Sequence, residues 1–120
     1  MINHYSETFR VSRDECISSI ESSLPDLLGT YILVKWIEIV CAGNIKRRLD
    51  EKCITVGKII SIEHTGMVKI GEVVEVMTAV KSHEKKIVSF TAEARCNGKI
   101  VAKASHERII IPVKLLKRLA

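Results

Sequence analysis

The chain has 120 residues, which suits one domain with one hydrophobic core, so no second domain is expected. Its net charge of +5 would suit DNA, an anionic membrane or a phosphorylated ligand, but aromatic residues make up only 4% and offer few platforms for stacked bases. We therefore expect no nucleic-acid partner. The apolar share of 47% is high for so short a chain and indicates a well-filled core or a subunit interface.

The cysteines bear on a metal site and on the compartment. There are four of them, Cys16, Cys41, Cys53 and Cys96. They form no CxxC pair and have no histidine at a zinc-like offset, so we expect free, mostly buried thiols and no metal. The apolar run 31–42 contains Lys35 and Glu38, which makes it too short and too charged to span a bilayer, and no secretory segment follows Met1. These features predict a cytoplasmic protein without a membrane partner.

The N-terminal third is expected to contain one strand, a short turn and one long helix. Apolar and polar residues alternate over 5–11, which predicts the strand, and Ser12 with Glu15 has the spacing of a capping box that opens a turn. Over 24–42 apolar residues cover almost every helical face, which predicts a buried helix. The polar residues over 44–50 are expected to form the turn that ends this helix.

The rest of the chain is rich in Val, Ile and Thr and is expected to form four antiparallel strands. The turn residues place these strands at 53–63, 72–81, 87–96 and 99–111. Asn97-Gly98 is the strongest turn signal, because a type I′ hairpin turn needs positive φ at both positions. Pro112 ends the last strand and leaves a basic C-terminal tail over 113–120.

This order of elements predicts an α+β fold, with a single domain over residues 1–120 and one face of an antiparallel sheet wrapped around the helix. The predicted strands are apolar, so a strand at the edge of the sheet should be paired with another strand or covered by another segment. The simplest partner is the same edge of a second copy of the chain. We therefore expect a homodimer, with pairing of dimers into a tetramer left open.

Glu38 is the first candidate for chemistry, because a carboxylate in a helix that is otherwise apolar is costly unless it is paired or functional. It could act as a general base, or it could pair with a Lys or Arg. Thr30 lies eight positions earlier, about 80° away around the helix, so both side chains could line one cleft. A hydroxyl at the start of a helix is the simpler account of Thr30.

Three further candidates lie on the predicted strands. Strict alternation places His64 on the same face as Val56 and Lys58, at a strand end suited to acid–base work or to binding a substrate, although a single histidine is more often structural. Gly57 weakens a strand unless the helix or a ligand carbonyl must approach its backbone. Arg108 could anchor a carbonyl or a phosphate, or could be a solvated strand residue.

Considered together, these positions resemble a known pattern. The set comprises Leu24-Pro25, Gly29-Thr30, Glu38, Val56-Gly57, His64, Gly71-Glu72 and His106-Glu107-Arg108. It is similar, over nearly the whole chain and in its spacings, to the fluoroacetyl-CoA thioesterase family of single-domain hotdog proteins. The resemblance implies a hotdog fold that hydrolyses an acyl-CoA thioester, with Thr30, Glu38 and His64 as catalytic residues and with Gly57, His64 and Arg108 contacting the substrate.

The same resemblance implies how these residues act. Glu38 would activate water or form a transient anhydride, while Thr30 and His64 orient Glu38 and the thioester and the Gly57 amide faces the carbonyl oxygen. No separate cofactor is implied, since coenzyme A is part of the substrate. The phenylalanine-rich lid of the fluoroacetyl enzyme has no counterpart over 21–28, so a short- or medium-chain acyl-CoA is expected instead. The alternative is a non-catalytic acyl-CoA-binding or sensing protein on the same fold.

Overall fold

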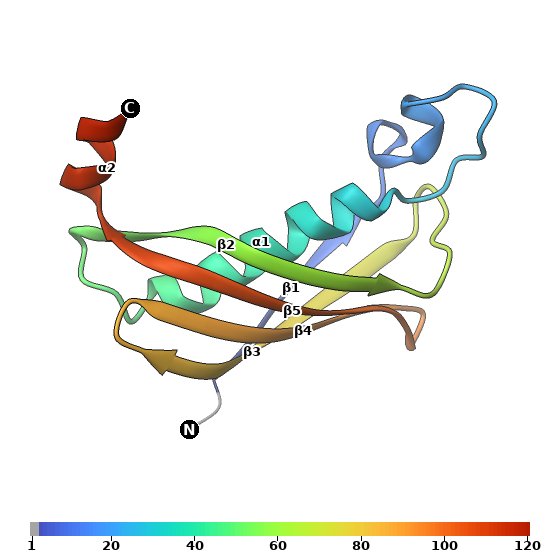
Figure 1. The fold of residues 1–120 in the computed structure, drawn as a ribbon. Coiled ribbons are helices and arrows are strands. Elements are labelled where there is room, and N and C mark those ends of the chain that lie inside the picture. Colours follow the sequence, from blue (N-terminus) through green and yellow to red (C-terminus); the bar gives the residue numbers. More distant parts are fainter. Residues whose placement is uncertain (1–2) are drawn as a thin grey trace.

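The strands pair into one antiparallel sheet, and a single long helix packs against one face of it (Figure 1). The computed structural model describes residues 3–120. Its elements are β1 (His4–Arg10), α1 (Thr30–Lys46), β2 (Cys53–His64), β3 (Val73–Glu84), β4 (Ile87–Cys96), β5 (Lys99–Pro112) and α2 (Val113–Leu119). The sheet order is β1-β3-β4-β5-β2, so β1 and β2 are the two edge strands. This is the α+β arrangement that the sequence predicts.

The five predicted strands are all present. β4 has the predicted bounds, and β2 and β5 each end one residue later than expected. β3 runs three residues further than predicted, to Glu84, so the turn that follows it is shorter. Asn97 and Gly98 have φ values of 52° and 76°, which confirms the predicted hairpin turn between β4 and β5.

The helix α1 starts later than predicted. A start at residue 24 was wrong, because Leu27 and Leu28 lie in extended chain and form bridges with Lys69 and Cys16. Gly29 is the N-cap, with an extended backbone, and Thr30 is the first helical residue. The amide of Gly29 donates to the Glu15 carbonyl at 3.0 Å. Contacts with distant segments therefore decide where the helix begins.

The end of α1 was also placed wrongly. Asn44 was expected in a polar turn, but it lies in the helix and is buried. Its side-chain amide donates to the Thr78 hydroxyl and to the Asn3 carbonyl, each at 3.0 Å. A buried amide is stable where its donors are used, so these contacts let the helix continue to Lys46.

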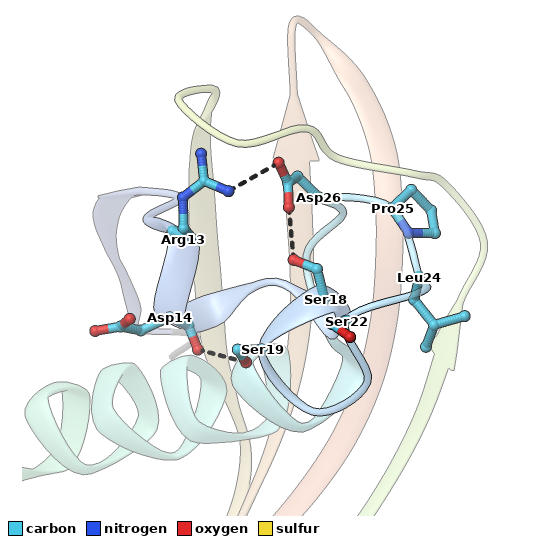
Figure 2. A pocket seen from close by; sticks show the side chains of 8 residues that line it. All are labelled: Arg13, Asp14, Ser18, Ser19, Ser22, Leu24, Pro25 and Asp26. Atoms are coloured by element: carbon cyan, nitrogen blue, oxygen red, sulfur yellow. Dashed lines mark hydrogen bonds and ion pairs between the residues drawn. The ribbon is translucent and has the colours of Figure 1, made fainter.

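The segment between β1 and α1 is held by side chains of its own. The amide of Ser12 donates to the Glu15 carboxylate at 2.9 Å, which confirms the predicted capping box, and a 3-10 turn spans Arg13–Glu15. Figure 2 shows Asp26 accepting from Ser18 at 2.6 Å and from Arg13 at 3.2 Å. These bonds fix the path of the chain into α1 and hence the position of Thr30.

A β-bulge interrupts the pairing of β2 with β5. Gly57 opposes Arg108 and Ile59 opposes Glu107, so Lys58 is one extra residue. Such an insertion shifts by one residue which side chains point to each face of the sheet.

The bulge corrects the predicted face of His64. Strict alternation placed His64 on the face of Val56 and Lys58. This prediction was wrong, because the extra residue at the bulge places His64 on the face that carries Gly57. Ile60, which lies between them on that face, packs against the hydrophobic core. Gly57 and His64 therefore both face the side of the sheet that holds α1.

The cysteines and the C-terminal tail complete the described chain. The four cysteines are free, with three buried and Cys53 half-buried. The basic tail forms the short helix α2, and the Val113 amide donates to the Lys52 carbonyl at 2.8 Å. Within residues 3–120, none of the helices has the length and apolarity needed to cross a membrane.

Candidate active site

Glu38 and Arg108 form an ion pair between α1 and β5. Glu38 Oε1 lies 3.4 Å from Arg108 Nη1, and the side chains are 44% and 9% exposed. The guanidinium is thus buried, while the carboxylate that pairs with it reaches the surface. The solvated account of Arg108 was wrong, because its side chain is buried. Glu38 does pair with an arginine. This pairing does not exclude a catalytic role for Glu38, which stays a prediction.

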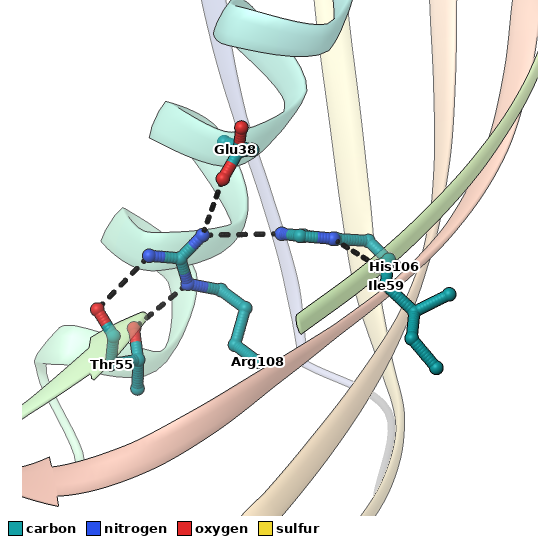
Figure 3. A network of polar contacts seen from close by, with 5 residues as sticks. All are labelled: Glu38, Thr55, Ile59, His106 and Arg108. Atoms are coloured by element: carbon teal, nitrogen blue, oxygen red, sulfur yellow. Dashed lines mark hydrogen bonds and ion pairs between the residues drawn. The ribbon is translucent and has the colours of Figure 1, made fainter. Parts of the chain in front are cut away.

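Three further contacts hold the Arg108 guanidinium (Figure 3). Its Nε donates to the Thr55 hydroxyl at 2.9 Å, and its Nη2 donates to the Thr55 carbonyl at 3.0 Å. Its Nη1 also lies 3.1 Å from Nε2 of His106. Sequence reasoning gave no role to Thr55 or His106. The pairing of β2 with β5 brings Thr55 to Arg108, and the single sequence does not show that register. His106 lies two residues before Arg108 on β5, so the alternation of the strand, which the sequence does show, already places both on one face.

His106 is buried and makes a second strong contact. Its Nδ1 lies 2.7 Å from the carbonyl oxygen of Ile59, the residue that follows the bulge. Burial lowers the pKa of His106, and the positive charge of Arg108 acts in the same direction. The folded protein therefore favours the neutral ring more than an exposed histidine would.

The lowered pKa of His106 predicts a pH dependence of stability. An unfolded chain binds a proton at this histidine near pH 6.5, whereas the lowered pKa means that the folded chain binds it only at a lower pH, so the free energy of unfolding should fall as pH drops below about 6.5. Urea unfolding between pH 7.5 and pH 5 measures this slope. The variant His106→Gln should show a smaller slope over that range, and an equal slope in both proteins would contradict the prediction.

Gly57 lies directly against the Glu38 carboxylate. A Cβ atom built on Gly57 would be 2.5 Å from Glu38 Oε1 and 3.6 Å from Arg108 Nη1. Glycine therefore lets the carboxylate approach the main chain of the edge strand β2. The structure thus brings together three predicted site residues, Glu38, Gly57 and Arg108.

Thr30 and His64 form a separate pair. Thr30 Oγ1 lies 2.8 Å from His64 Nδ1. The other ring nitrogen of His64, Nε2, is buried and has no hydrogen-bond partner within the described chain. Buried polar atoms without a partner are rare in proteins, so this nitrogen is a candidate for contact with a substrate or with a group from another subunit.

The two clusters are apart within one protomer. Thr30 and Glu38 are eight positions apart in the helix, which corresponds to about 12 Å along the axis of α1. Within residues 3–120, neither Thr30 nor His64 forms a hydrogen bond with Glu38. The predicted catalytic trio is therefore not assembled by a single chain.

An open groove of about 650 Å³ lies beside the Glu38–Arg108 cluster. Thr55 and Arg108 line one part of it, and the apolar side chains of Ile39, Ala42 and Ile54 line another. Grooves of this size and polarity accommodate small organic ligands.

The chain was compared with known proteins. A sequence profile of the fluoroacetyl-CoA-specific thioesterase family matches residues 11–114. Among solved structures, a thioesterase superfamily member from Thermus thermophilus has a TM-score of 0.90 and 20% identity, with 97% of this chain and 86% of that chain covered. The fluoroacetyl-CoA thioesterase FlK has a TM-score of 0.88 and 19% identity, with 96% and 90% covered. No curated protein matches significantly.

A hot-dog-like protein from Thermanaerovibrio acidaminovorans is similar to the same degree, with a TM-score of 0.88 at 17% identity and coverage of 96% and 85%. These structures confirm the predicted hotdog fold. The family profile extends over most of the chain, including all five site residues predicted from the sequence. The protein therefore belongs to the fluoroacetyl-CoA-specific thioesterase family and is a thioester hydrolase.

Proposed function

We propose that the protein hydrolyses a short- or medium-chain acyl-CoA to the free acid and coenzyme A, with Glu38 as base or nucleophile. The observation that carries this proposal is the approach of the Glu38 carboxylate to the main chain at Gly57. A thioester carbonyl placed there can meet a carboxylate and a backbone amide at the same time. Arg108 keeps the carboxylate in that position through its ion pair.

Two routes use this arrangement. In the base route, Glu38 takes a proton from water while the water oxygen bonds to the carbonyl carbon. In the nucleophile route, the Glu38 oxygen itself bonds to that carbon, and water later cleaves the resulting anhydride. In both routes the carbon–sulfur bond breaks, and the coenzyme A thiolate leaves and takes up a proton. The Gly57 amide would donate to the oxyanion that forms on the way.

A homodimer through β2 would bring the two clusters together. β2 is an edge strand, and four large apolar side chains are exposed along it and along α1: Tyr31, Ile39, Ile54 and Ile59. A second copy paired at this edge would cover them.

In such a dimer the two β2 strands run antiparallel about a two-fold axis. The His64 end of one strand then lies toward the Cys53 end of the other. We propose that the Thr30–His64 pair of one protomer faces the Glu38–Arg108 pair of its partner, with the acyl-CoA between them. The unpartnered Nε2 of His64 would contact the substrate or Glu38 there.

The substrate proposal rests on the segment before α1. Residues 21–28 contain no aromatic side chain, and Leu24 in this segment is exposed. No bulky lid therefore restricts the acyl group to fluoroacetyl. The groove beside Arg108 leaves room for a longer chain.

A panel of acetyl-, butyryl-, octanoyl- and palmitoyl-CoA tests the proposal. Loss of the thioester should be followed directly by absorbance or chromatography, because half-buried Cys53 would react with thiol dyes. We expect turnover, with the highest kcat/KM among the short and medium chains. Binding without turnover for every member of the panel would refute the hydrolase and favour an acyl-CoA sensor.

Gly57→Ala tests the contact that carries the proposal. The added methyl group would displace the Glu38 carboxylate, which is half-exposed and stands at the end of a flexible side chain, so the fold should survive. A displaced catalytic group should lower kcat/KM by about 10- to 100-fold. Ser61→Ala, at an exposed position of the same strand, is the matched control. Equal kcat/KM in Gly57→Ala and wild type would show that the approach of Glu38 to Gly57 does not contribute to turnover.

A further inference from the structure

We infer that His106 is a positioning residue: its bond to the Ile59 carbonyl leaves Nε2 free to accept from Arg108, so that His106, together with Thr55, holds the guanidinium against Glu38. The inference rests on the proposed function, because it assigns the orientation of Glu38 to a residue that does not touch the substrate. Figure 3 shows the chain of contacts from Ile59 to His106, Arg108 and Glu38.

The two contacts of the ring define its protonation. A carbonyl oxygen only accepts hydrogen bonds, so Nδ1, at 2.7 Å from the Ile59 oxygen, must carry a proton. A guanidinium only donates, so Nε2, at 3.1 Å from Arg108 Nη1, must be unprotonated and accept the hydrogen bond. The geometry therefore requires the neutral tautomer with the proton on Nδ1.

The surroundings of the ring favour the same state. His106 is only 3% exposed. The charged groups that face it are Arg108 on β5 and Glu38 on α1, while β4 contributes the uncharged ring of Phe90. A proton on Nε2 would place a second cation beside the Arg108 guanidinium and would remove the acceptor.

The same nitrogen of Arg108 serves both neighbours. Nη1 lies 3.1 Å from His106 Nε2 and 3.4 Å from Glu38 Oε1. Thr55 binds the other two nitrogens, so Thr55 and His106 together hold the planar guanidinium, and His106 supplies the shorter of the two contacts of Nη1. Loss of the His106 acceptor would remove that shorter contact, and the guanidinium and the carboxylate paired with it would shift relative to the Gly57 main chain.

Two substitutions separate the ring's contacts. The side-chain oxygen of His106→Gln can take the place of Nε2 and accept from Arg108, whereas the amide of His106→Asn can take the place of Nδ1 and donate to Ile59. We expect His106→Gln to retain kcat within about threefold of wild type on the best acyl-CoA substrate. His106→Asn should lose about tenfold or more in kcat with little change in KM. Melting temperatures of the two variants should be similar.

Nitrogen-15 NMR of the imidazole gives a readout that does not need turnover. The His106 signals, assigned by their loss in His106→Gln, should show the neutral tautomer with the proton on Nδ1 from pH 6 to pH 8. A charged ring, a proton on Nε2, or equal kcat in the Gln and Asn variants would overturn the inference. A wild-type protein that hydrolyses no acyl-CoA would instead overturn the proposed function. The nitrogen-15 NMR measurement of the tautomer would still test whether His106 accepts from Arg108.

Discussion

Replacement of Glu38 by glutamine is expected to lower kcat by about 10²- to 10⁴-fold on every acyl-CoA that the wild-type protein hydrolyses. Glutamine has nearly the same shape and keeps an oxygen that can accept from Arg108 Nη1, which lies 3.4 Å from Glu38 Oε1. It can act neither as a base nor as a nucleophile. The loss should therefore appear in kcat, with a smaller change in KM. Steady-state kinetics by direct measurement of the thioester gives both constants.

The control must show that the loss is chemical. Glu38→Gln leaves the buried Arg108 without its ion pair, so some loss of stability is expected and must be measured by thermal unfolding. Glu93→Gln removes a glutamate from a surface ion pair with Arg95 and should leave kcat unchanged. A folded Glu38→Gln protein with wild-type kcat would show that Glu38 is neither the base nor the nucleophile.

Wild-type protein can also distinguish the two routes. An anhydride at Glu38 reacts with hydroxylamine to leave a hydroxamate on that residue, which mass spectrometry detects. The base route forms no bond between Glu38 and the acyl group. A hydroxamate that appears only during turnover therefore assigns the nucleophile route, and its absence favours activation of water.

The fold was predictable where local patterns decide the structure. Period-two patterning and turn residues located all five strands, and Asn97-Gly98 has the backbone that its hairpin turn requires. The bounds of α1 were wrong because distant contacts set them. Asn44 is polar and predicts a helix end, yet hydrogen bonds with β3 and with the start of the chain keep it inside the helix.

The sequence supplied candidate residues for the site but not their geometry. The resemblance to a known family supplied Thr30, Glu38, Gly57, His64 and Arg108. The bulge at Lys58 is invisible in an alternating pattern, and it decides that His64 and Gly57 share a face. The bond between Glu38 and Arg108 joins residues 70 positions apart, and it depends on the register of a strand against a helix.

Replacement of Ile59 by lysine is expected to separate the proposed dimer and to remove most of the activity. Ile59 lies on the edge strand β2 and is 52% exposed in one protomer, so a lysine there should cost a single chain little stability. A two-fold interface repeats every substitution, so each dimer would have to bury two new charges. We expect self-association to weaken by about 100-fold or more. Sedimentation at micromolar concentration measures the change.

Activity then tests whether the site needs both subunits. If Thr30 and His64 of one protomer act with Glu38 of its partner, the specific activity of Ile59→Lys should be low in dilute solution and should rise with protein concentration as dimers re-form. Met77→Lys is the matched control, because Met77 is 37% exposed on β3, away from the β2 edge, and should leave both association and activity unchanged. A monomeric Ile59→Lys protein with full specific activity would show that one chain holds a complete site. The roughly 12 Å between Thr30 and Glu38 along α1 argues against that outcome, because the substrate's single reacting carbonyl cannot contact both clusters of one protomer.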